Sequence, residues 1–236
     1  MEELLLLPLL LLPLGTAVVI NLIGKYLKVN QIAQISSLGL AGAFSISLLL
    51  FLMLGLNNFE SLSFNYFTWI DAMNISVGLR WDGLTGVMAL LITLLSFIIQ
   101  LFSASYMEKD ERIATYFVYF NFFVFSMLLL VLSSNFLILF IGWELVGLSS
   151  YLLISFWYKK DAASSAGKKA FILNRIGDAG FLIGLMIIFD IFDSFDYDFI
   201  FSNTNVLNSN QASLIAFFLM IGAFGLYRIT KRSYKD

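Results

Sequence analysis

The sequence contains no cysteine and no histidine among its 236 residues. Iron–sulfur clusters, haem groups and structural zinc ions are held mainly by these two residue types, so the sequence excludes sites built on them. It also lacks the Gly-x-Gly-x-x-Gly and P-loop patterns, so no nucleotide site is evident. Any redox or nucleotide chemistry connected with this protein is therefore expected in other chains.

Charge is also scarce. Only 13% of the residues are charged, against about 25% in a soluble domain. No basic patch suggests nucleic acid as a partner. By contrast, 60% of the residues are hydrophobic, and they form runs of about 20 residues, the length that crosses a bilayer as a helix. The composition predicts an all-α fold, a polytopic bundle of transmembrane helices, rather than a water-soluble helical bundle.

The apolar runs predict about seven spans within a single transmembrane domain over residues 1–236. Pro8 and Pro13 are expected to kink the first span. A polar interval, Asn57 to Asp82, carries aromatic residues and is expected to form a loop at the membrane interface. The predicted spans are residues 4–26, 32–56, 83–105, 113–132, 136–157, 170–192 and 212–227.

The basic residues are distributed asymmetrically around these spans. Seven spans place twelve of the 14 Lys and Arg residues on one side, which is a strong positive-inside signal. It predicts that the N-terminus lies outside and the tail inside. The twelve are Lys25, Lys28, Lys109, Arg112, Lys159, Lys160, Lys168, Lys169, Arg228, Lys231, Arg232 and Lys235.

Three ionisable residues lie inside the predicted spans: Glu144 in the fifth, and Arg175 and Asp178 in the sixth. An isolated charge at the bilayer centre costs about 2.5–3.5 kcal/mol on insertion scales. Arg175 and Asp178 are three residues apart on one helix face, so they can pair, although the sequence leaves open whether Arg175 pairs with Asp178, with Glu144 or with both. Lys168 and Lys169 lie about two turns nearer the inner surface, which outlines a polar path to the membrane centre.

Each of these groups has a structural and a functional interpretation. The Arg175–Asp178 pair is either an ion pair that pins the fifth and sixth spans or part of the polar path. Glu144 has no basic residue within one turn of its own span. A carboxyl group in apolar surroundings can exchange protons at physiological pH, so the sequence favours a proton relay at Glu144 over a purely structural role.

Three blocks resemble a known family: Trp81-Asp82-Gly83-Leu84-Thr85, the segment from Phe140 to Trp157, and the segment from Lys169 to Asp178. They are similar to the antiporter-like membrane subunits of proton-pumping NADH:ubiquinone oxidoreductase (respiratory complex I), its subunit 5 type in particular. Subunits of multisubunit cation/proton antiporters are related to this family. The resemblance runs in order from about Arg80 to Phe224.

The resemblance implies roles for individual residues. Glu144 occupies the position of the family's glutamate in the first proton half-channel, and Lys169, Arg175 and Asp178 match polar positions of its sixth helix. It also implies an H⁺-translocating NADH:ubiquinone reductase whose flavin, iron–sulfur clusters and ubiquinone are bound by partner subunits, with no cofactor in this chain. The implied partners are the other membrane-arm subunits and membrane lipids.

The sequence departs from the family after Gly222-Ala223-Phe224. Members continue into a Thr-Lys segment whose lysine is the proton carrier paired with the glutamate. Here Lys231 lies further along, in a basic tail, where we expect an anchor at the inner surface. Members also have more than a dozen helices. We therefore expect the N-terminal fragment of a split subunit, completed by a second chain that carries the C-terminal part.

A split gene suggests an organelle genome, and so the mitochondrial inner membrane with the N-terminus on the intermembrane side and the C-terminus on the matrix side. Two alternatives to an active half-channel stay open. One is a structural scaffold fragment without pumping, and the other is a subunit of a multisubunit sodium/proton antiporter. A seven-span receptor fits the span count but leaves Glu144 and Asp178 unexplained.

Overall fold

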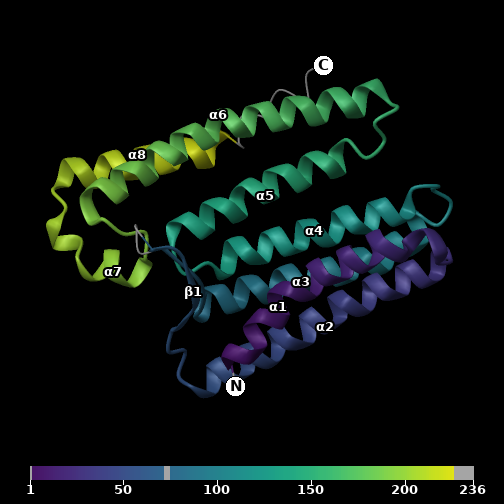
Figure 1. Ribbon diagram of the computed structural model, residues 1–236, viewed down its shortest axis with the longest axis horizontal. Helices are drawn as coiled ribbons and strands as arrows, with labels where there is room; N and C mark the ends of the chain where they lie inside the picture. The colour runs from purple at the N-terminus through teal and green to yellow at the C-terminus, as the bar shows by residue number, and fades with distance from the viewer. Residues whose placement is uncertain (1, 72–74, 226–236) are drawn as a thin grey trace. The chain divides into compact units, whose positions relative to one another are not determined.

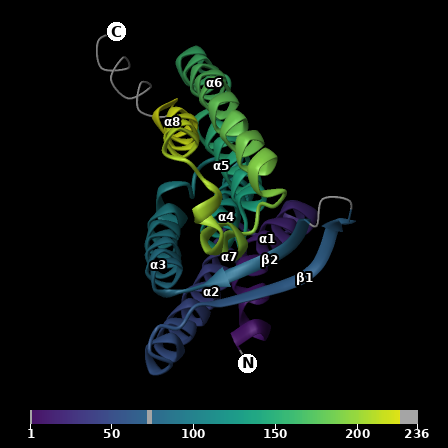
Figure 2. The same cartoon turned by 90° about the vertical axis from the view of Figure 1, so that its left-hand side faces the viewer.

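A computed structural model of the chain describes residues 2–71 and 75–225. It confirms a helical membrane fold and adds a two-stranded sheet, β1 with β2 (Figures 1 and 2). The elements are α1 (Glu2–Ile23), η1 (Gly24–Tyr26), α2 (Val29–Leu56), β1 (Leu62–Ile70), β2 (Ile75–Trp81), α3 (Gly83–Tyr106), α4 (Ile113–Leu132), α5 (Phe136–Ile154), α6 (Asp161–Phe192), α7 (Tyr197–Ser202), η3 (Thr204–Val206) and α8 (Ser209–Gly225).

Within the described residues, six helices are long and apolar enough to cross a membrane: α1 to α6. The apolar helix α8 is shorter, at 17 residues. The last two residues of the predicted seventh span, and the basic tail with Lys231, lie outside the described residues. The number of membrane crossings therefore stays a prediction.

The described residues form two compact units: residues 2–64 and 79–133 form the first, and residues 65–71, 75–78 and 134–225 form the second. That the two act as one domain, as the sequence predicts, stays a prediction. In the first unit, α2 packs on α1 and α3, and α4 packs on α1 and α3. In the second unit, α6 packs against both α5 and α8, as Figure 1 shows.

The helix α3 in the first unit has an inverted distribution of side chains. Nearly all of its exposed positions are apolar, among them Leu91, Ile98 and Phe102. Its buried face instead carries hydroxyl and amide groups: Thr85, Thr93, Ser96, Gln100 and Ser103. A helix that presents apolar residues outward and polar residues to its neighbours is suited to lipid, where hydrogen bonds between helices contribute to packing.

The second unit has an apolar core on α6. Phe181, Leu185, Ile188 and Phe192 repeat at intervals of four and three residues, so they share one face of the helix, and all are buried. On the same helix, a Cβ at Gly180 would come within 2.6 Å of Ile221 on α8, and one at Gly184 would meet Leu219 at 3.0 Å. The absence of a side chain at these two glycines therefore permits the close approach of α6 and α8.

Two sequence-based boundaries are wrong. The interval Asn57 to Asp82 contains β1 and β2 rather than a loop alone, because Leu62, Phe64 and Tyr66 alternate with polar residues at the period of a strand. The predicted sixth span, residues 170–192, begins too late, since α6 already begins at Asp161. Alanine favours helix, and an acidic residue in the first turn is favourable there, so the helix extends beyond its apolar run.

Asp82 caps the start of α3. Its carboxylate accepts a hydrogen bond from the Thr85 backbone N–H at 2.9 Å and forms an ion pair with Arg80, whose Nε lies 3.0 Å away. Partial burial alone would raise the pKa of Asp82, but the Thr85 hydrogen bonds and the Arg80 guanidinium outweigh it and hold the pKa below its usual value. The ionised form is thus the better cap.

An Asp82→Ala variant is expected to lose about 0.5–2 kcal/mol of stability at neutral pH, the usual cost of a lost N-cap. This corresponds to a thermal midpoint lowered by about 2–4 °C per kcal/mol for a chain of this size. The pKa of Asp82 is lower in the folded protein than in the unfolded chain. The ionised cap therefore stabilises the fold fully at pH values above the unfolded pKa, and this stabilisation is lost as the pH falls through the folded pKa. The midpoint difference should therefore shrink below about pH 4. Asp82→Asn, which can still cap, is the control, and an equal loss in both variants would contradict the capping role.

Candidate functional site

The three charged residues predicted within the membrane lie on two neighbouring helices of the second unit. Glu144 is near the middle of the 19-residue α5, and Asp178 is near the middle of the 32-residue α6. Arg175 precedes Asp178 on α6 by about one turn. The helices α5 and α6 pack against each other, which brings the two carboxyl groups and the guanidinium into one cluster.

Arg175 forms an ion pair with Glu144 across the two helices. The Glu144 side chain is 19% exposed and that of Arg175 is 48% exposed, so the pair lies at the edge of the helix interface. The guanidinium also lies over the ring of Phe171, 5.0 Å from its centre, which holds the cation in place by a cation–π contact. The pairing of Arg175, which the sequence left open, thus includes Glu144.

Asp178 is the most buried member of the cluster, at 7% exposure. Trp143 donates a hydrogen bond from its indole Nε1 to the Asp178 Oδ1 atom, at 2.8 Å. The Trp143 ring stacks on Phe181 of α6, with ring centres 5.9 Å apart. One residue on α5 therefore fixes the carboxylate of Asp178, and the next residue, Glu144, binds Arg175.

The sequence did not identify Trp143 as a partner, although it lies beside Glu144. A signal was available, because a buried indole N–H normally requires an acceptor, and Asp178 is an acceptor at matching depth. Asn174 was also missed. Its amide nitrogen lies 3.5 Å from where a Cβ of Gly147 would be, so these helices approach closely there. Its Oδ1 atom is buried without a hydrogen-bond partner among the described residues.

Lys168 and Lys169 are not part of this cluster. Both belong to α6, about two turns before Arg175, and both side chains are exposed. They lie on a helix rather than in a loop, which places them on the same element as Arg175 and Asp178. Among the described residues, no group of three or more His, Cys, Asp and Glu side chains could hold a metal ion.

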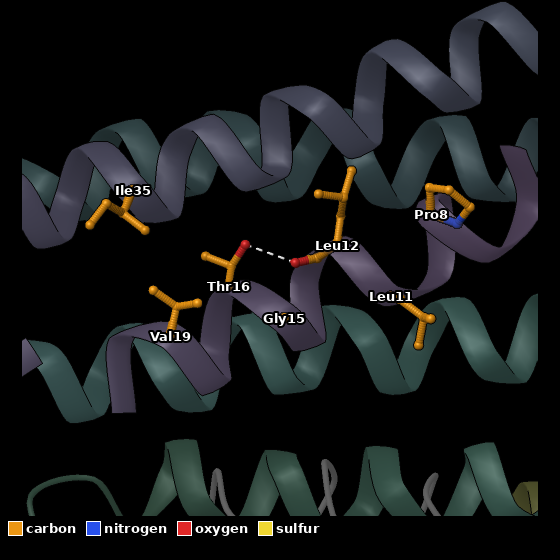
Figure 3. Close-up of a pocket in the computed structure, with 7 residues that line it drawn as sticks. All are labelled: Pro8, Leu11, Leu12, Gly15, Thr16, Val19 and Ile35. Atoms are coloured by element: carbon orange, nitrogen blue, oxygen red, sulfur yellow. Dashed lines mark hydrogen bonds between the residues drawn. The ribbon is translucent and has the colours of Figure 1, made fainter. Parts of the chain in front are cut away.

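An apolar groove in the first unit offers no comparable chemistry (Figure 3). Its only hydroxyl, that of Thr16, donates to the Leu12 carbonyl oxygen at 2.7 Å within the same helix. The groove is lined by Pro8, Leu11, Leu12, Gly15, Thr16, Val19 and Ile35. The α5–α6 cluster is therefore the candidate site.

A Trp143→Phe variant tests the contact with Asp178. Phenylalanine keeps an aromatic ring on Phe181 but removes the N–H donor, so a buried carboxylate loses a hydrogen bond. Such a loss costs about 1–3 kcal/mol, or roughly 2–4 °C of thermal midpoint per kcal/mol. Trp157→Phe, the same change at an exposed residue in the turn after α5, is the control. If both variants shifted the midpoint of the purified assembly equally, the indole would have no special role.

Two family models match the chain. One, described as NADH-ubiquinone oxidoreductase (complex I) chain 5 N-terminus, covers residues 66–117. The other, described as NADH:quinone oxidoreductase/Mrp antiporter transmembrane region, covers residues 133–227 and so includes the whole cluster.

Curated relatives and a solved structure agree with these matches. NADH-ubiquinone oxidoreductase chain 5 of Mycosarcoma maydis is 37% identical over 93% of this chain and 33% of the relative. Chain 5 of Metridium senile is 38% identical over 90% of this chain and 36% of the relative. NADH-quinone oxidoreductase subunit L of Rhodobacter capsulatus is 43% identical over 66% and 25%, respectively. This chain thus spans about a third of the length of such relatives.

The solved structure is the archaeal membrane-bound sulfane sulfur reductase, a respiratory membrane complex. One of its chains superposes with a TM-score of 0.80 at 19% identity, over 93% of this chain and 44% of that chain. This likeness shows the fold alone. The family matches and the 35–43% identical relatives lead to one assignment: the chain belongs to the antiporter-like family of NADH:quinone oxidoreductase and Mrp antiporter membrane subunits, and resembles the N-terminal part of chain 5.

Proposed function

We propose that this chain is a membrane-arm subunit of a proton-pumping NADH:ubiquinone oxidoreductase and contributes part of a proton half-channel. Glu144, Arg175 and Asp178 form its intramembrane part, and Lys168 and Lys169 form its approach along α6. The chain holds no redox group in this proposal. Flavin, iron–sulfur clusters and ubiquinone belong to partner subunits, and the chain transmits the energy of NADH oxidation to proton movement.

The observation that carries this proposal is the Glu144–Arg175 ion pair beside the buried Asp178, on two apolar helices. Ionisable groups at this depth are costly and are commonly found along proton or ion paths. Two carboxyl groups, Glu144 paired with the guanidinium and Asp178 held by the Trp143 indole, provide alternative positions for a proton. A change in the protonation of either carboxyl would change the attraction that holds Arg175, which is the coupling a relay requires.

Location and orientation form part of the same proposal. The eukaryotic relatives named chain 5 support the mitochondrial inner membrane as the location. The positive-inside count supports a matrix side that receives the basic loops and an N-terminus on the intermembrane side. The relatives are about three times longer, so the helices of the complementary half-channel would come from the remaining two thirds. These helices are carried either on the same polypeptide or on a second chain.

A cation/proton antiporter subunit is the second candidate. It is favoured by one specific observation: the model matching residues 133–227 covers Mrp antiporters as well as NADH:quinone oxidoreductases. The α5–α6 cluster would serve either machine, since both move protons. The two candidates differ in their partners rather than in this chain.

Purification from native membranes in mild detergent, followed by mass spectrometry of the accompanying chains, tests the proposal. We expect flavin- and iron–sulfur-bearing subunits, NADH:quinone activity, and peptides of the complementary helices in the same assembly. Redox subunits without those helices would instead indicate a scaffold with one proton path fewer. An assembly without redox subunits or quinone chemistry would contradict the proposal and favour the antiporter.

A further inference from the structure

A second polar cluster lies in the first unit, on helices other than those that carry the proposed relay. It consists of Ser36 on α2, Gln100 on α3 and Asn121 on α4, all with 0% exposure. Each lies about two helical turns from the end of its helix. The helix α3 runs antiparallel to α2 and α4, so its end lies beside the starts of those two helices. The three residues therefore lie at a similar depth within membrane-spanning segments.

The three side chains meet at one hydroxyl group. Gln100 Nε2 and Asn121 Nδ2 both donate hydrogen bonds to Ser36 Oγ. Asn121 Nδ2 also donates to the Phe117 carbonyl oxygen at 2.8 Å, within α4. Both donors of the Asn121 amide and one donor of the Gln100 amide are therefore directed at protein atoms, and the cluster joins three helices at a single point.

The acceptors of the same two amides have no partner in the described part of the chain. Gln100 Oε1 and Asn121 Oδ1 are both buried, and neither accepts a hydrogen bond from any described residue. Each oxygen shares its carbon atom with a nitrogen bound to the same hydroxyl, so both oxygens lie near Ser36. Leaving two amide oxygens unpaired at membrane depth is costly, because no bulk solvent reaches them and each amide normally uses its acceptor.

We propose that Ser36, Gln100 and Asn121 form an internal binding site for one water molecule. The water donates one hydrogen to Gln100 Oε1 and the other to Asn121 Oδ1, which satisfies both acceptors. A neutral ligand with two donors fits the site because all three side chains are uncharged. A buried water typically makes two to four such bonds and is held as part of the structure.

Further polar contacts extend from the site along α3. Ser103 Oγ lies 2.9 Å from the Tyr116 hydroxyl, one turn to one side. On the other side, two turns away, Thr93 Oγ1 lies 2.9 Å from Ser47 Oγ. The bound water would therefore complete a polar seam within the first unit, where α2, α3 and α4 are joined by hydrogen bonds rather than by apolar packing alone.

The test is an electron cryo-microscopy map of the purified assembly at a resolution that shows ordered water. We expect a peak about 2.7–3.2 Å from both Gln100 Oε1 and Asn121 Oδ1. A map that resolves other buried waters but shows none here would overturn the proposal. So would a peak that disappears when sodium in the buffer is replaced by choline, since the ligand would then be a cation.

Variants sharpen this test. Gln100→Leu removes one of the two acceptors, and we expect the peak to be lost. Ser126→Ala is the matched control, because Ser126 is equally buried on α4 but its hydroxyl donates only to the Phe122 carbonyl of its own helix, at 2.8 Å. We expect the peak to persist there. A peak that survived in Gln100→Leu would contradict the assignment, and the wild-type map decides the matter if that variant does not assemble.

Discussion

A Glu144→Gln variant is expected to lose proton pumping while the assembly still forms. Glutamine has nearly the same shape and can still accept a hydrogen bond from Arg175, so packing of α5 on α6 is retained. However, an amide cannot take up and release a proton at physiological pH. Positioned proton-transfer groups typically contribute factors of 10² or more to rate, so we expect proton flux to fall by at least about tenfold. The measurement is vesicle acidification coupled to NADH oxidation in proteoliposomes.

Asp190→Asn is the matched control for this experiment. Asp190 is a carboxylate on the same α6 helix as Asp178, but it is exposed and lies near the helix end. The change has the same chemistry and removes the same charge, and we expect proton flux to be preserved. If Glu144→Gln pumped at the rate of Asp190→Asn, a relay role for Glu144 would be refuted. A loss of assembled complex in Glu144→Gln would instead point to the structural interpretation of the ion pair.

The sequence indicated the candidate site through one property, the presence of charged residues inside apolar runs. Apolar runs locate the spans, and charged residues within the runs then stand out. Glu144, Arg175 and Asp178 were found in this way, and the structure brings the three together on α5 and α6. Depth alone places two residues at the same level of the membrane, but it does not give the rotation of each helix about its axis.

That rotation decides which atoms bond, and it explains what was missed. The alternatives for Arg175 stayed open because the neighbouring carboxyl on its own helix and the one on α5 are equally near in depth. The indole of Trp143 looked like part of an apolar run, since hydropathy does not register a single N–H group. Hydropathy also failed at the start of α6 and in β1, where polar residues are part of regular structure.

The Arg175–Glu144 pair yields the second large effect, which separates a relay from a structural contact. We expect Arg175→Gln to lower proton flux severalfold, because Glu144 then has no cation to bind and release. The two single variants and the double variant form a double-mutant cycle. The logarithm of each proton-flux ratio converts the effect of each change into a free energy. If the pair acts as one unit, Glu144→Gln with Arg175→Gln is no slower than Glu144→Gln alone.

The exposure of the two side chains bounds the coupling free energy expected between Arg175 and Glu144. Exposed ion pairs contribute about 0.2–1 kcal/mol, whereas contacting residues in one network show couplings of about 0.5–3 kcal/mol. Because the Arg175 side chain is 48% exposed and that of Glu144 is 19% exposed, a coupling on the order of 1 kcal/mol is expected for thermal stability. A much larger coupling in proton flux than in stability would show that the pair acts in transfer.

Arg175→Lys completes the argument, because it keeps the positive charge but shortens the reach and removes the planar guanidinium. A relay that needs only a cation near Glu144 should retain most of its flux in this variant. A pair that serves to pin α5 on α6 depends on the guanidinium geometry and on its contact with Phe171. In that case Arg175→Lys should destabilise the assembly nearly as much as Arg175→Gln, while the remaining assembled complex pumps at the normal rate. Additive flux losses in the cycle, together with that pattern, would assign the pair to structure and leave the proton relay to Asp178.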